Sequence, residues 1–327
     1  MDRARLAVDG PSGRGGVFMA EPRGPVLSVI VVVVSDTTRS RYNTELLTGT
    51  LDALSKQVDA PPLEITVPYV PPLPGVEALG ERYPRVHFAP VRDIAGYDAV
   101  TPGREHHDGL RAHGISLAAG DIIGLLEDHG RPAPHWAASM VEAHRGEWAG
   151  VGGAIENGID RPLNWAVYFC DFGRYQNPLQ AGESDFASDA NSSYKRVALA
   201  SIRHIWRESF REPTVNRALQ SRGGKLALAP GAVMYQYRQG LRLGDAMKER
   251  FIWGRSFGML RGESIRVAER LAYAAVSAAI PPLLVFRIVR RAISKGRTGA
   301  VLKALPPLLL LTAAWACGEF TGYVKGR

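Results

Sequence analysis

Residues 114–136 read GISLAAGDIIGLLEDHGRPAPHW, and this stretch decides the expected fold. Its centre, Asp121–Leu126, is a short apolar run that predicts a buried strand, and the preceding His107–Ala119 predicts a helix. Three ionisable residues, Glu-Asp-His at 127–129, follow the strand directly. Ionisable side chains behind a buried strand conflict with burial, and such conflicts concentrate at functional sites.

The same alternation of strand and helix extends outward from this stretch toward the N-terminus. The predicted strands are Val26–Val34, Leu63–Val67 and Val86–Pro90, and the predicted helices are Thr44–Gln57 and Val76–Tyr83. Strands that alternate with helices predict an α/β fold with a doubly wound, mostly parallel, Rossmann-like sheet. Ligands of such sheets bind beyond the carboxyl ends of the strands, which directs attention to residues 127–129.

Residues 127–129 have two interpretations. They are either a polar strand end that caps the next helix, or a site for a metal ion or a diphosphate. Alternate residues of an extended segment point the same way, so Glu127 and His129 are expected to face one ion, with Asp128 turned to the opposite side. Carboxylate plus imidazole suits Mn²⁺ at least as well as Mg²⁺.

Composition narrows the class of partner. The 327 residues carry a formal net charge of +8, which indicates an anionic partner such as phosphates or an anionic bilayer face. The sequence has no RNA-binding signature, zinc finger or interleaved Lys/aromatic pattern, so no nucleic-acid partner is expected. Cys170 and Cys317 stand far apart, which indicates a reducing compartment without disulfide or zinc frameworks. Residues 1–25 lack the apolar core of a signal peptide and are predicted to be a flexible leader.

From about Leu27 to Arg255 the chain resembles the family 2 glycosyltransferases, which have the GT-A fold. The resemblance rests on SVIVVVVSD at 28–36, on the stretch 114–136, and on EPTVNRALQSRGGKLALAPGAVMYQ at 212–236. Such enzymes usually carry an ARNxGxxxAxGD helix, a strand, an Asp-x-Asp metal motif, and then Pro and Trp. The matching residues here are Arg111, Gly114, Ala118, Gly120, Asp121, Pro134 and Trp136. Glu127 and His129 stand where the two aspartates would be.

The resemblance implies an inverting transfer of a sugar from a nucleotide-diphosphate donor to a hydroxyl of a lipid-linked or cell-surface glycan. It implies a hexosyltransferase-type enzyme in polysaccharide biosynthesis, with Mn²⁺ or Mg²⁺ held by Glu127 and His129. The expected domains are a leader at 1–25, a GT-A catalytic domain at 26–262, and a membrane-associated helical tail at 263–327.

The resemblance also implies the position of the catalytic base. Inversion in one displacement needs a general base beside the acceptor oxygen. In this family the base is an acid before a helix that ends in Gly, followed by a strand that ends in Pro. Glu212 stands eleven residues before Gly223, and Pro230 follows Gly223 by seven. Glu212 is therefore the predicted base, with Glu208 as the nearest rival. The alternative is that Glu212 is only a helix N-terminal acid before Pro213.

The remaining site residues are also implied by the resemblance. The expected donor contacts are Val33, Ser35, Asp36, Tyr69, Arg111 and Asp128. The expected acceptor-side residues are Trp165, Asn191 and Tyr194, for which core packing or a polar turn is the alternative. Two departures stand out, since Pro68-Tyr69 replaces a base-reading acid and Gln236 replaces a histidine near the metal. They leave open a catalytically weak glycosyltransferase-like protein that binds or scaffolds at the membrane.

Two apolar runs close the chain, Leu271–Phe286 with sixteen residues and Ala304–Gly318 with fifteen. Both are shorter than a bilayer span, and each contains a Pro-Pro pair that is expected to kink or break a helix. Six basic residues and no acid lie between the runs. We expect a hairpin of broken, re-entrant or interface-lying helices on the anionic cytoplasmic face of a membrane. A spanning two-helix hairpin and the buried helices of a soluble dimer are the alternatives.

Overall fold

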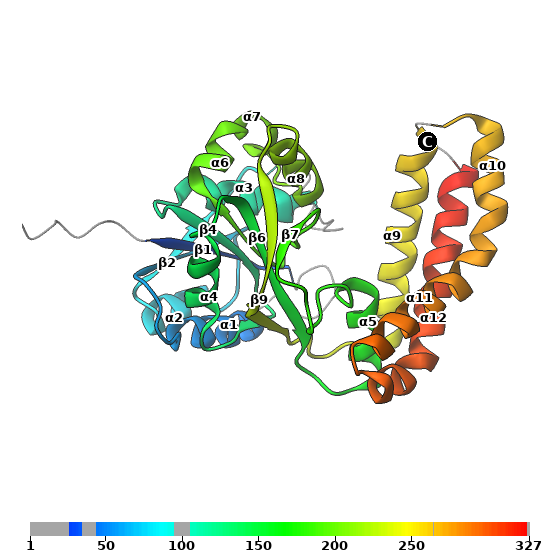
Figure 1. The fold of residues 1–327 in the computed structure, drawn as a ribbon, viewed down its shortest axis with the longest axis horizontal. Coiled ribbons are helices and arrows are strands. Elements are labelled where there is room, and N and C mark those ends of the chain that lie inside the picture. Colours follow the sequence, from blue (N-terminus) through cyan, green and yellow to red (C-terminus); the bar gives the residue numbers. More distant parts are fainter. Residues whose placement is uncertain (1–25, 35–43, 95–104, 264, 326–327) are drawn as a thin grey trace, which may run out of the picture.

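The computed structural model describes residues 26–34, 44–94, 105–263 and 265–325. These residues form a nine-stranded sheet with helices packed on it, and a bundle of long helices that stands beside the sheet (Figure 1). The strands are β1 (Leu27–Val32), β2 (Leu63–Tyr69), β3 (Val86–Pro90), β4 (Ile122–Glu127), β5 (Gly130–Pro132), β6 (Trp148–Asn157), β7 (Gly182–Ser184), β8 (Asn191–Lys195) and β9 (Lys225–Gln236). The expected α/β fold is confirmed.

The helices follow the strands in the order that the sequence predicts for the first half of the chain. Those that pack around the sheet are α1 (Glu45–Ser55), α2 (Val76–Arg82), α3 (Glu105–Leu117), α4 (Trp136–Ala143), α5 (Pro162–Asp171), α6 (Arg196–Ser201), α7 (Arg203–Trp206) and α8 (Glu212–Gln220). Those of the bundle are α9 (Leu243–Glu263), α10 (Val267–Val276), the 3₁₀ turn η2 (Ser277–Ala279), α11 (Ile280–Ser294) and α12 (Thr298–Lys325).

The strand order is β3-β2-β1-β4-β8-β6-β9-β5, with β7 paired to β9 beside β5. The pairs β3-β2, β2-β1, β1-β4 and β6-β9 are parallel, and the other pairs are antiparallel. Followed across the sheet, β1, β2, β3, β4, β6 and β9 all run in one direction. From β1 the chain winds outward to β2 and β3, whereas β4 lies on the other side of β1. Such a reversal of strand order opens a crevice at the carboxyl ends of the two strands.

The run 29–34 is apolar throughout because the sheet is covered on both faces. Val29, Val31 and Val33 belong to one buried apolar cluster, and the alternate residues Ile30, Val32 and Val34 belong to the other. Period-two alternation sends neighbouring side chains to opposite faces, so a strand buried on both faces needs an apolar residue at every position. The same clusters receive the apolar side of α1 on one face and of α3 on the other.

The helical bundle is joined to the sheet domain through α5. Val301, Ala304, Leu308 and Leu311 of α12 belong to the same buried cluster as the aromatic residues of α5. Within the bundle α9 packs along α12, so in space the helical unit begins at α9, before the domain boundary expected at 262.

The contact between α9 and α12 is made by glycines spaced four residues apart on both helices. They are Gly254 and Gly258 on α9, and Gly318 and Gly322 on α12. A side chain at any of the four would clash with a backbone carbonyl of the facing helix. Backbones approach this closely only where both helices present small residues, an arrangement common between membrane helices.

The two Pro-Pro pairs of the tail behave differently. Pro281-Pro282 lies in the first turn of α11, so one helix ends and another begins at this pair. Pro306-Pro307 lies inside α12, which continues through it, so the expected break there is wrong. Proline removes backbone donors, but α12 is held on both sides of the pair by packing against α5 and α9. By length and composition, Thr298–Val324 of α12 is long and apolar enough to cross a membrane. The uncharged run within it, Ala304–Gly318, has fifteen residues and is shorter than a bilayer span. The bent pair α10 and α11 also passes this test together.

Candidate active site

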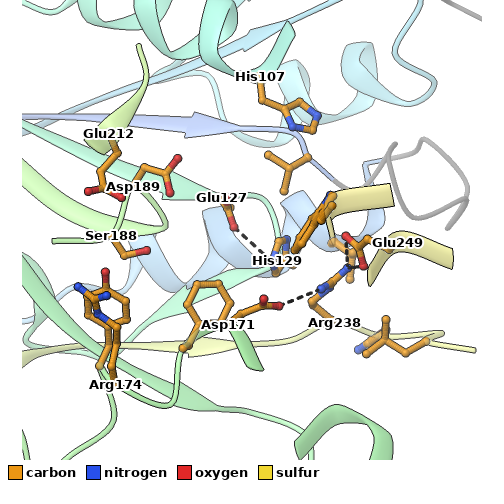
Figure 2. Close-up of a pocket in the computed structure, with 17 residues that line it drawn as sticks. His107, Glu127, His129, Asp171, Arg174, Ser188, Asp189, Glu212, Arg238 and Glu249 are labelled. Carbon is orange, nitrogen blue, oxygen red and sulfur yellow. Dashed lines mark hydrogen bonds and ion pairs between the residues drawn. The ribbon is translucent and has the colours of Figure 1, made fainter. Parts of the chain in front are cut away.

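A cleft of about 260 Å³ opens beyond the carboxyl ends of β1 and β4, at the reversal of strand order. Figure 2 shows acidic residues on both of its sides, with Glu127 and His129 between them. Its carboxylates are those of Glu127, Asp171, Asp189, Glu212 and Glu249. Its arginines are Arg174 and Arg238, and His107, Ser188 and Trp253 also line it.

Asp128 fixes the floor of the cleft from behind. Its backbone N–H donates to the carbonyl of Val32 at 2.9 Å, and its Oδ1 accepts the N–H of Val34 at 3.2 Å. The hydroxyl of Thr50 donates to the backbone carbonyl of Asp128 at 2.6 Å. Asp128 is fully buried and is not among the described residues that line the cleft, and it ties β4 to β1 and α1.

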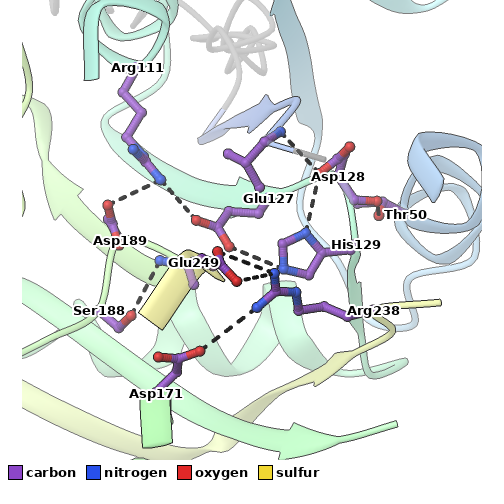
Figure 3. A network of polar contacts seen from close by, with 12 residues as sticks. Thr50, Arg111, Glu127, Asp128, His129, Asp171, Ser188, Asp189, Arg238 and Glu249 are labelled. Atoms are coloured by element: carbon purple, nitrogen blue, oxygen red, sulfur yellow. Dashed lines mark hydrogen bonds and ion pairs between the residues drawn. The ribbon is translucent and has the colours of Figure 1, made fainter. Parts of the chain in front are cut away.

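Glu127 and His129 face each other in the cleft, although Asp128 and His129 form a turn after β4 and do not continue the strand. Glu127 Oε2 lies 3.4 Å from His129 Nε2, and His129 Nδ1 lies 3.3 Å from Asp128 Oδ1 (Figure 3). A proton on Nδ1 that is donated to Asp128 leaves Nε2 with a free lone pair. A lone pair and a carboxylate this close repel each other unless a cation or a proton lies between them.

The pair therefore fits a divalent cation as two ligands of mixed carboxylate and imidazole character, a set that suits Mn²⁺. Across the described residues, no group of three His, Cys, Asp or Glu side chains comes together as a complete metal site. An ion held here would take its other ligands from the substrate or from water.

Arg111 is buried directly behind the cleft and holds two of its carboxylates in place. Its Nη2 lies 2.9 Å from Glu127 Oε1 and 3.1 Å from Asp189 Oδ2, and its Nη1 lies 3.2 Å from Asp108 Oδ1 (Figure 3). Burial lowers the pKa of the guanidinium, but these three carboxylates outweigh burial and raise it. Arg111 thus stays charged, and it holds the carboxylates of Glu127 and Asp189 in place.

Glu212 is the first residue of α8 and lines the side of the cleft away from Arg238 (Figure 2). Burial, and then the nearby charge of Asp189, raise the pKa of Glu212 to about 7. Asn216 Nδ2 donates to Glu212 Oε1 at 2.5 Å, and the hydroxyl of Tyr194 donates to Asn216 Oδ1 at 2.9 Å. A carboxylate held in this way and half protonated near neutral pH suits a general base.

Both interpretations of Glu212 apply, because it is the N-terminal acid of α8 and also lines the cleft. The rival acid Glu208 is exposed and pairs with Arg207 at 3.3 Å, outside the cleft.

The opposite side of the cleft joins the sheet domain to the helical bundle. Arg238, after β9, lies 3.2 Å from Glu249 Oε2 of α9 and 3.8 Å from Asp171 Oδ2 at the end of α5. Buried Arg250 of α9 lies 2.5 Å from the same Asp171 oxygen. Since Glu249 and Trp253 line the cleft, α9 contributes directly to the candidate site.

The three acceptor-side residues expected from the sequence do not reach the cleft. Asn191 is buried in the sheet, where it accepts from Trp136 Nε1 at 2.7 Å and donates to two backbone carbonyls. Trp165 donates to Asp160 at 2.7 Å and packs in α5. Tyr194 is buried behind Glu212. Asn191 and Tyr194 are enclosed because β8 lies in the middle of the sheet, and Trp165 is enclosed because α5 packs into the buried apolar cluster.

Not all of the expected donor contacts line the cleft. Val33 is buried in the core while its neighbour Val34 lines the cleft, and Tyr69 packs against the core at the end of β2. Ser35 and Asp36 lie outside the described residues.

Several cleft residues were not predicted from the sequence. Among them are Asp171, Phe172, Arg174 and Tyr175, which lie at the end of α5 and just after it. Asp189 and Arg238 carried no local signal, because each is an isolated charge in an irregular segment.

The chain matches no protein-family model and no curated protein. Among solved structures it is similar to the mannosyltransferase PcManGT from Pyrobaculum calidifontis, in complex with GDP-Man and Mn²⁺. The sequences are 16% identical, the match covers 90% of this chain and 87% of that chain, and the TM-score is 0.49. At this identity and TM-score, a shared function does not follow from the likeness.

Proposed function

We propose that the protein is an inverting glycosyltransferase that moves a sugar from a nucleotide-diphosphate donor to an acceptor hydroxyl. The observation that carries the proposal is the arrangement of one cleft at the reversal of strand order. Glu212 lines one side of this cleft with a pKa raised to about 7, and the Glu127–His129 pair lies at its centre. This arrangement separates a proton-accepting group from a group suited to a phosphate-bound cation.

The charge of the cleft supports a metal ion as part of the donor complex. Among the described residues that line the cleft, five carboxylates face two arginines, and Arg238 is already paired with carboxylates. A nucleoside diphosphate would be repelled from such a cleft without a cation. Glu127 and His129 are the residues that would hold Mn²⁺ or Mg²⁺, and the bound ion would neutralise the leaving diphosphate as a Lewis acid.

The reaction needs one proton acceptor, and Glu212 is placed for it. Its carboxylate takes the proton of the acceptor hydroxyl as the oxygen bonds to the anomeric carbon of the sugar. The bond from that carbon to the diphosphate breaks, and the nucleoside diphosphate leaves with the electron pair. Asn216 orients the carboxylate, and Arg111 holds Glu127 and Asp189 in place.

The tail supports a position at the cytoplasmic face of an anionic membrane. Large apolar side chains are exposed along the bundle, among them Leu260, Leu271, Val276, Leu283, Phe286, Leu302, Leu309 and Phe320. Only 33% of the apolar window of α12 is buried. The basic residues between the apolar runs are Arg287, Arg290, Arg291, Lys295, Arg297 and Lys303. Arg297 and Lys303 pair with Glu156 and Asp160, whereas the other four have no ion pair among the described residues. Apolar surface beside this excess of basic charge favours binding to anionic lipid.

A second candidate is a glycosyltransferase-like protein that binds a donor at the membrane without turning it over. Gln236 favours it, since the amide group of this residue is buried without a hydrogen-bond partner among the described residues. An amide here supplies a weaker metal ligand than the histidine expected from the family resemblance.

Turnover separates the two candidates. The parent protein, Glu212→Gln and the matched control Glu208→Gln are incubated with a panel of nucleotide-sugars, with Mn²⁺ or with EDTA, and free nucleoside diphosphate is measured. We expect Mn²⁺-dependent release from one donor by the parent and the control, and at least a hundredfold loss in Glu212→Gln. Binding of a donor without release by any of the three proteins supports the second candidate. Equal release by all three refutes the role of Glu212.

A further inference from the structure

The turn between α11 and α12 contacts a chain segment that lines the cleft. Just after α11, Gly296 takes a left-handed φ of 71°, and its backbone N–H donates to the carbonyl of Ile293 at 2.9 Å. The N–H of Arg297 donates to the carbonyl of Ala292 at 2.8 Å. These two bonds form a Schellman motif, which fixes the course of the chain after a helix. The motif therefore sets the positions of Lys295 and Arg297, on either side of the glycine.

The segment in question is residues 172–177, which follow α5 and which we call the cleft segment. Its Arg174 and Tyr175 line the cleft. Lys295 donates from Nζ to the backbone carbonyl of Arg174 at 3.3 Å, and it also donates to the carbonyl of Gln176. The carbonyl between them, that of Tyr175, accepts a backbone N–H of β6 at 3.0 Å. Hydrogen bonds from an ammonium group are stronger than those between neutral groups, so Lys295 ties the cleft segment firmly to the turn.

A second contact of the same turn holds the end of the cleft segment. Arg297 Nη2 lies 3.1 Å from Glu156 Oε2, near the end of β6. The other oxygen of Glu156, Oε1, accepts the backbone N–H of Asn177 at 2.8 Å. Glu156 is buried, and a buried carboxylate needs both a counter-charge and hydrogen-bond donors. Lys295 and Arg297 therefore hold the cleft segment at two points.

The side chain of Arg174 is fixed to its own surroundings. Its guanidinium carbon lies 3.7 Å from the ring centre of Phe186 and 5.1 Å from that of Tyr175, so two aromatic rings hold it by stacking. Arg238 pairs with carboxylates, whereas no ion pair to Arg174 is found in the described part of the chain. The cleft segment thus carries a positive charge that no neighbouring carboxylate neutralises.

This charge acts on the candidate base. Arg174 and Glu212 line the same side of the cleft (Figure 2). Burial, and then Asp189, raise the pKa of Glu212 to about 7. Among the groups that oppose this rise, Arg174 has the largest effect, followed by Asn216 and Arg111. The position of the cleft segment therefore affects how readily the base ionises.

We propose that Lys295 and Arg297 are positioning residues for the transfer reaction, because they hold the segment that keeps Arg174 in the cleft with Glu212. This proposal rests on the proposed function, in which Glu212 is the base. Both positioning residues belong to the helical bundle, whose α9 also supplies Glu249 to the cleft. The bundle thus takes part in the site through two separate elements.

Hydrogen exchange tests the hold on the cleft segment without turnover. Amide exchange in peptides that cover residues 172–177 is measured by mass spectrometry in the full-length parent and its variants. Lys295→Met and Arg297→Met should each exchange about tenfold faster than the parent, because each loses a charged contact of the segment. Lys303→Met is the matched control, since Lys303 joins the same bundle to Asp160 at 3.2 Å, outside the cleft segment, and it should exchange like the parent.

The pH dependence of kcat/KM tests whether this hold matters for the base. Because Arg174 lowers the pKa of Glu212, Lys295→Met and Arg174→Gln should both shift the midpoint to higher pH. The double variant should shift no further than Arg174→Gln alone, because the lysine acts through the arginine. Lys295→Arg keeps a charged donor and should restore the midpoint of the parent, and Lys303→Met should keep it.

Three results overturn the proposal: unchanged exchange in Lys295→Met, equal acceleration in Lys303→Met, or a midpoint that does not move in Lys295→Met. A parent that releases no nucleoside diphosphate from any donor overturns the proposed function instead. Faster exchange in Lys295→Met would then still support the hold of the turn on the cleft segment, so the two failures give different results.

Discussion

Replacing Glu212 by Gln tests the candidate base through stability as well as through rate. The carboxyl group is largely buried, its pKa is raised from 4.5 to about 7, and Asn216 donates to Oε1, which Gln retains. At about 1.4 kcal/mol for each tenfold change in acidity, ionising Glu212 in the folded protein costs about 3 kcal/mol more than in the unfolded chain. Because the group keeps some contact with water, this figure is an upper value.

The pH dependence has a definite sign. Below about 4.5 the group is protonated in the folded and unfolded states alike and has no effect on the free energy of unfolding. Between about 4.5 and 7 the unfolded chain loses the proton while the folded protein keeps it, so stability falls as pH rises. Above about 7 the loss is complete. Glu212→Gln lacks this loss, and we expect it to be more stable than the parent by up to about 3 kcal/mol at pH 8 and equal to it at pH 4.

Thermal unfolding of the parent, Glu212→Gln and the exposed control Glu208→Gln is followed from pH 4 to pH 9. The melting temperature of Glu212→Gln should rise above that of the parent only at the higher pH values, whereas Glu208→Gln should follow the parent throughout. In parallel, kcat/KM of the parent should increase with pH through about 7, since the base must be ionised to act. A stability difference that does not vary with pH, or an activity that falls through this range, refutes the assignment of Glu212.

Four further predictions follow from the contacts. Asp189→Asn removes a charge that raises the pKa of Glu212, so the pH at which kcat/KM reaches half its plateau should shift to lower values. Arg111→Met leaves buried carboxylates unpaired and should lower the free energy of unfolding by about 3–5 kcal/mol, measured in urea. His129→Ala removes one of two proposed metal ligands and should raise the Mn²⁺ concentration for half-maximal activity at least tenfold, with an unchanged melting temperature in EDTA. Gly258→Val forces α9 away from α12 and should cost about 1–3 kcal/mol in thermal unfolding, whereas Val at Gly244, around which the described residues leave open space, should cost less.

The order of elements in the first half of the chain follows from local patterns. Apolar runs of five to nine residues, separated by amphipathic segments, predicted β1 to β4 and α1 to α3 nearly to the residue, because each pattern reflects burial of the element's own surface. Glu127 and His129 do face each other, but through the turn that follows β4 and not through the strand alternation expected from the sequence.

In the tail, local sequence patterns do not predict the structure. Pro306-Pro307 predicted a break, but α12 runs through the pair because two other elements pack against it. The glycines of α9 and α12 can be interpreted only when the two helices are seen together. Each glycine leaves room for the backbone of the facing helix.

The sequence by itself determined the α/β fold and directed attention to the end of β4, because strand burial depends on neighbouring residues. The candidate base Glu212 came from the family resemblance and not from a local pattern. Only the tertiary structure decided which side chains share the cleft. Asp171, Arg174, Asp189, Arg238 and Glu249 come from four separate segments, and no local pattern marked any of them. Asn191 and Tyr194 looked like site residues, but the middle of the sheet enclosed them. The physical reason is that a residue's role here depends on which distant segments pack against it, and sequence spacing carries no record of that packing.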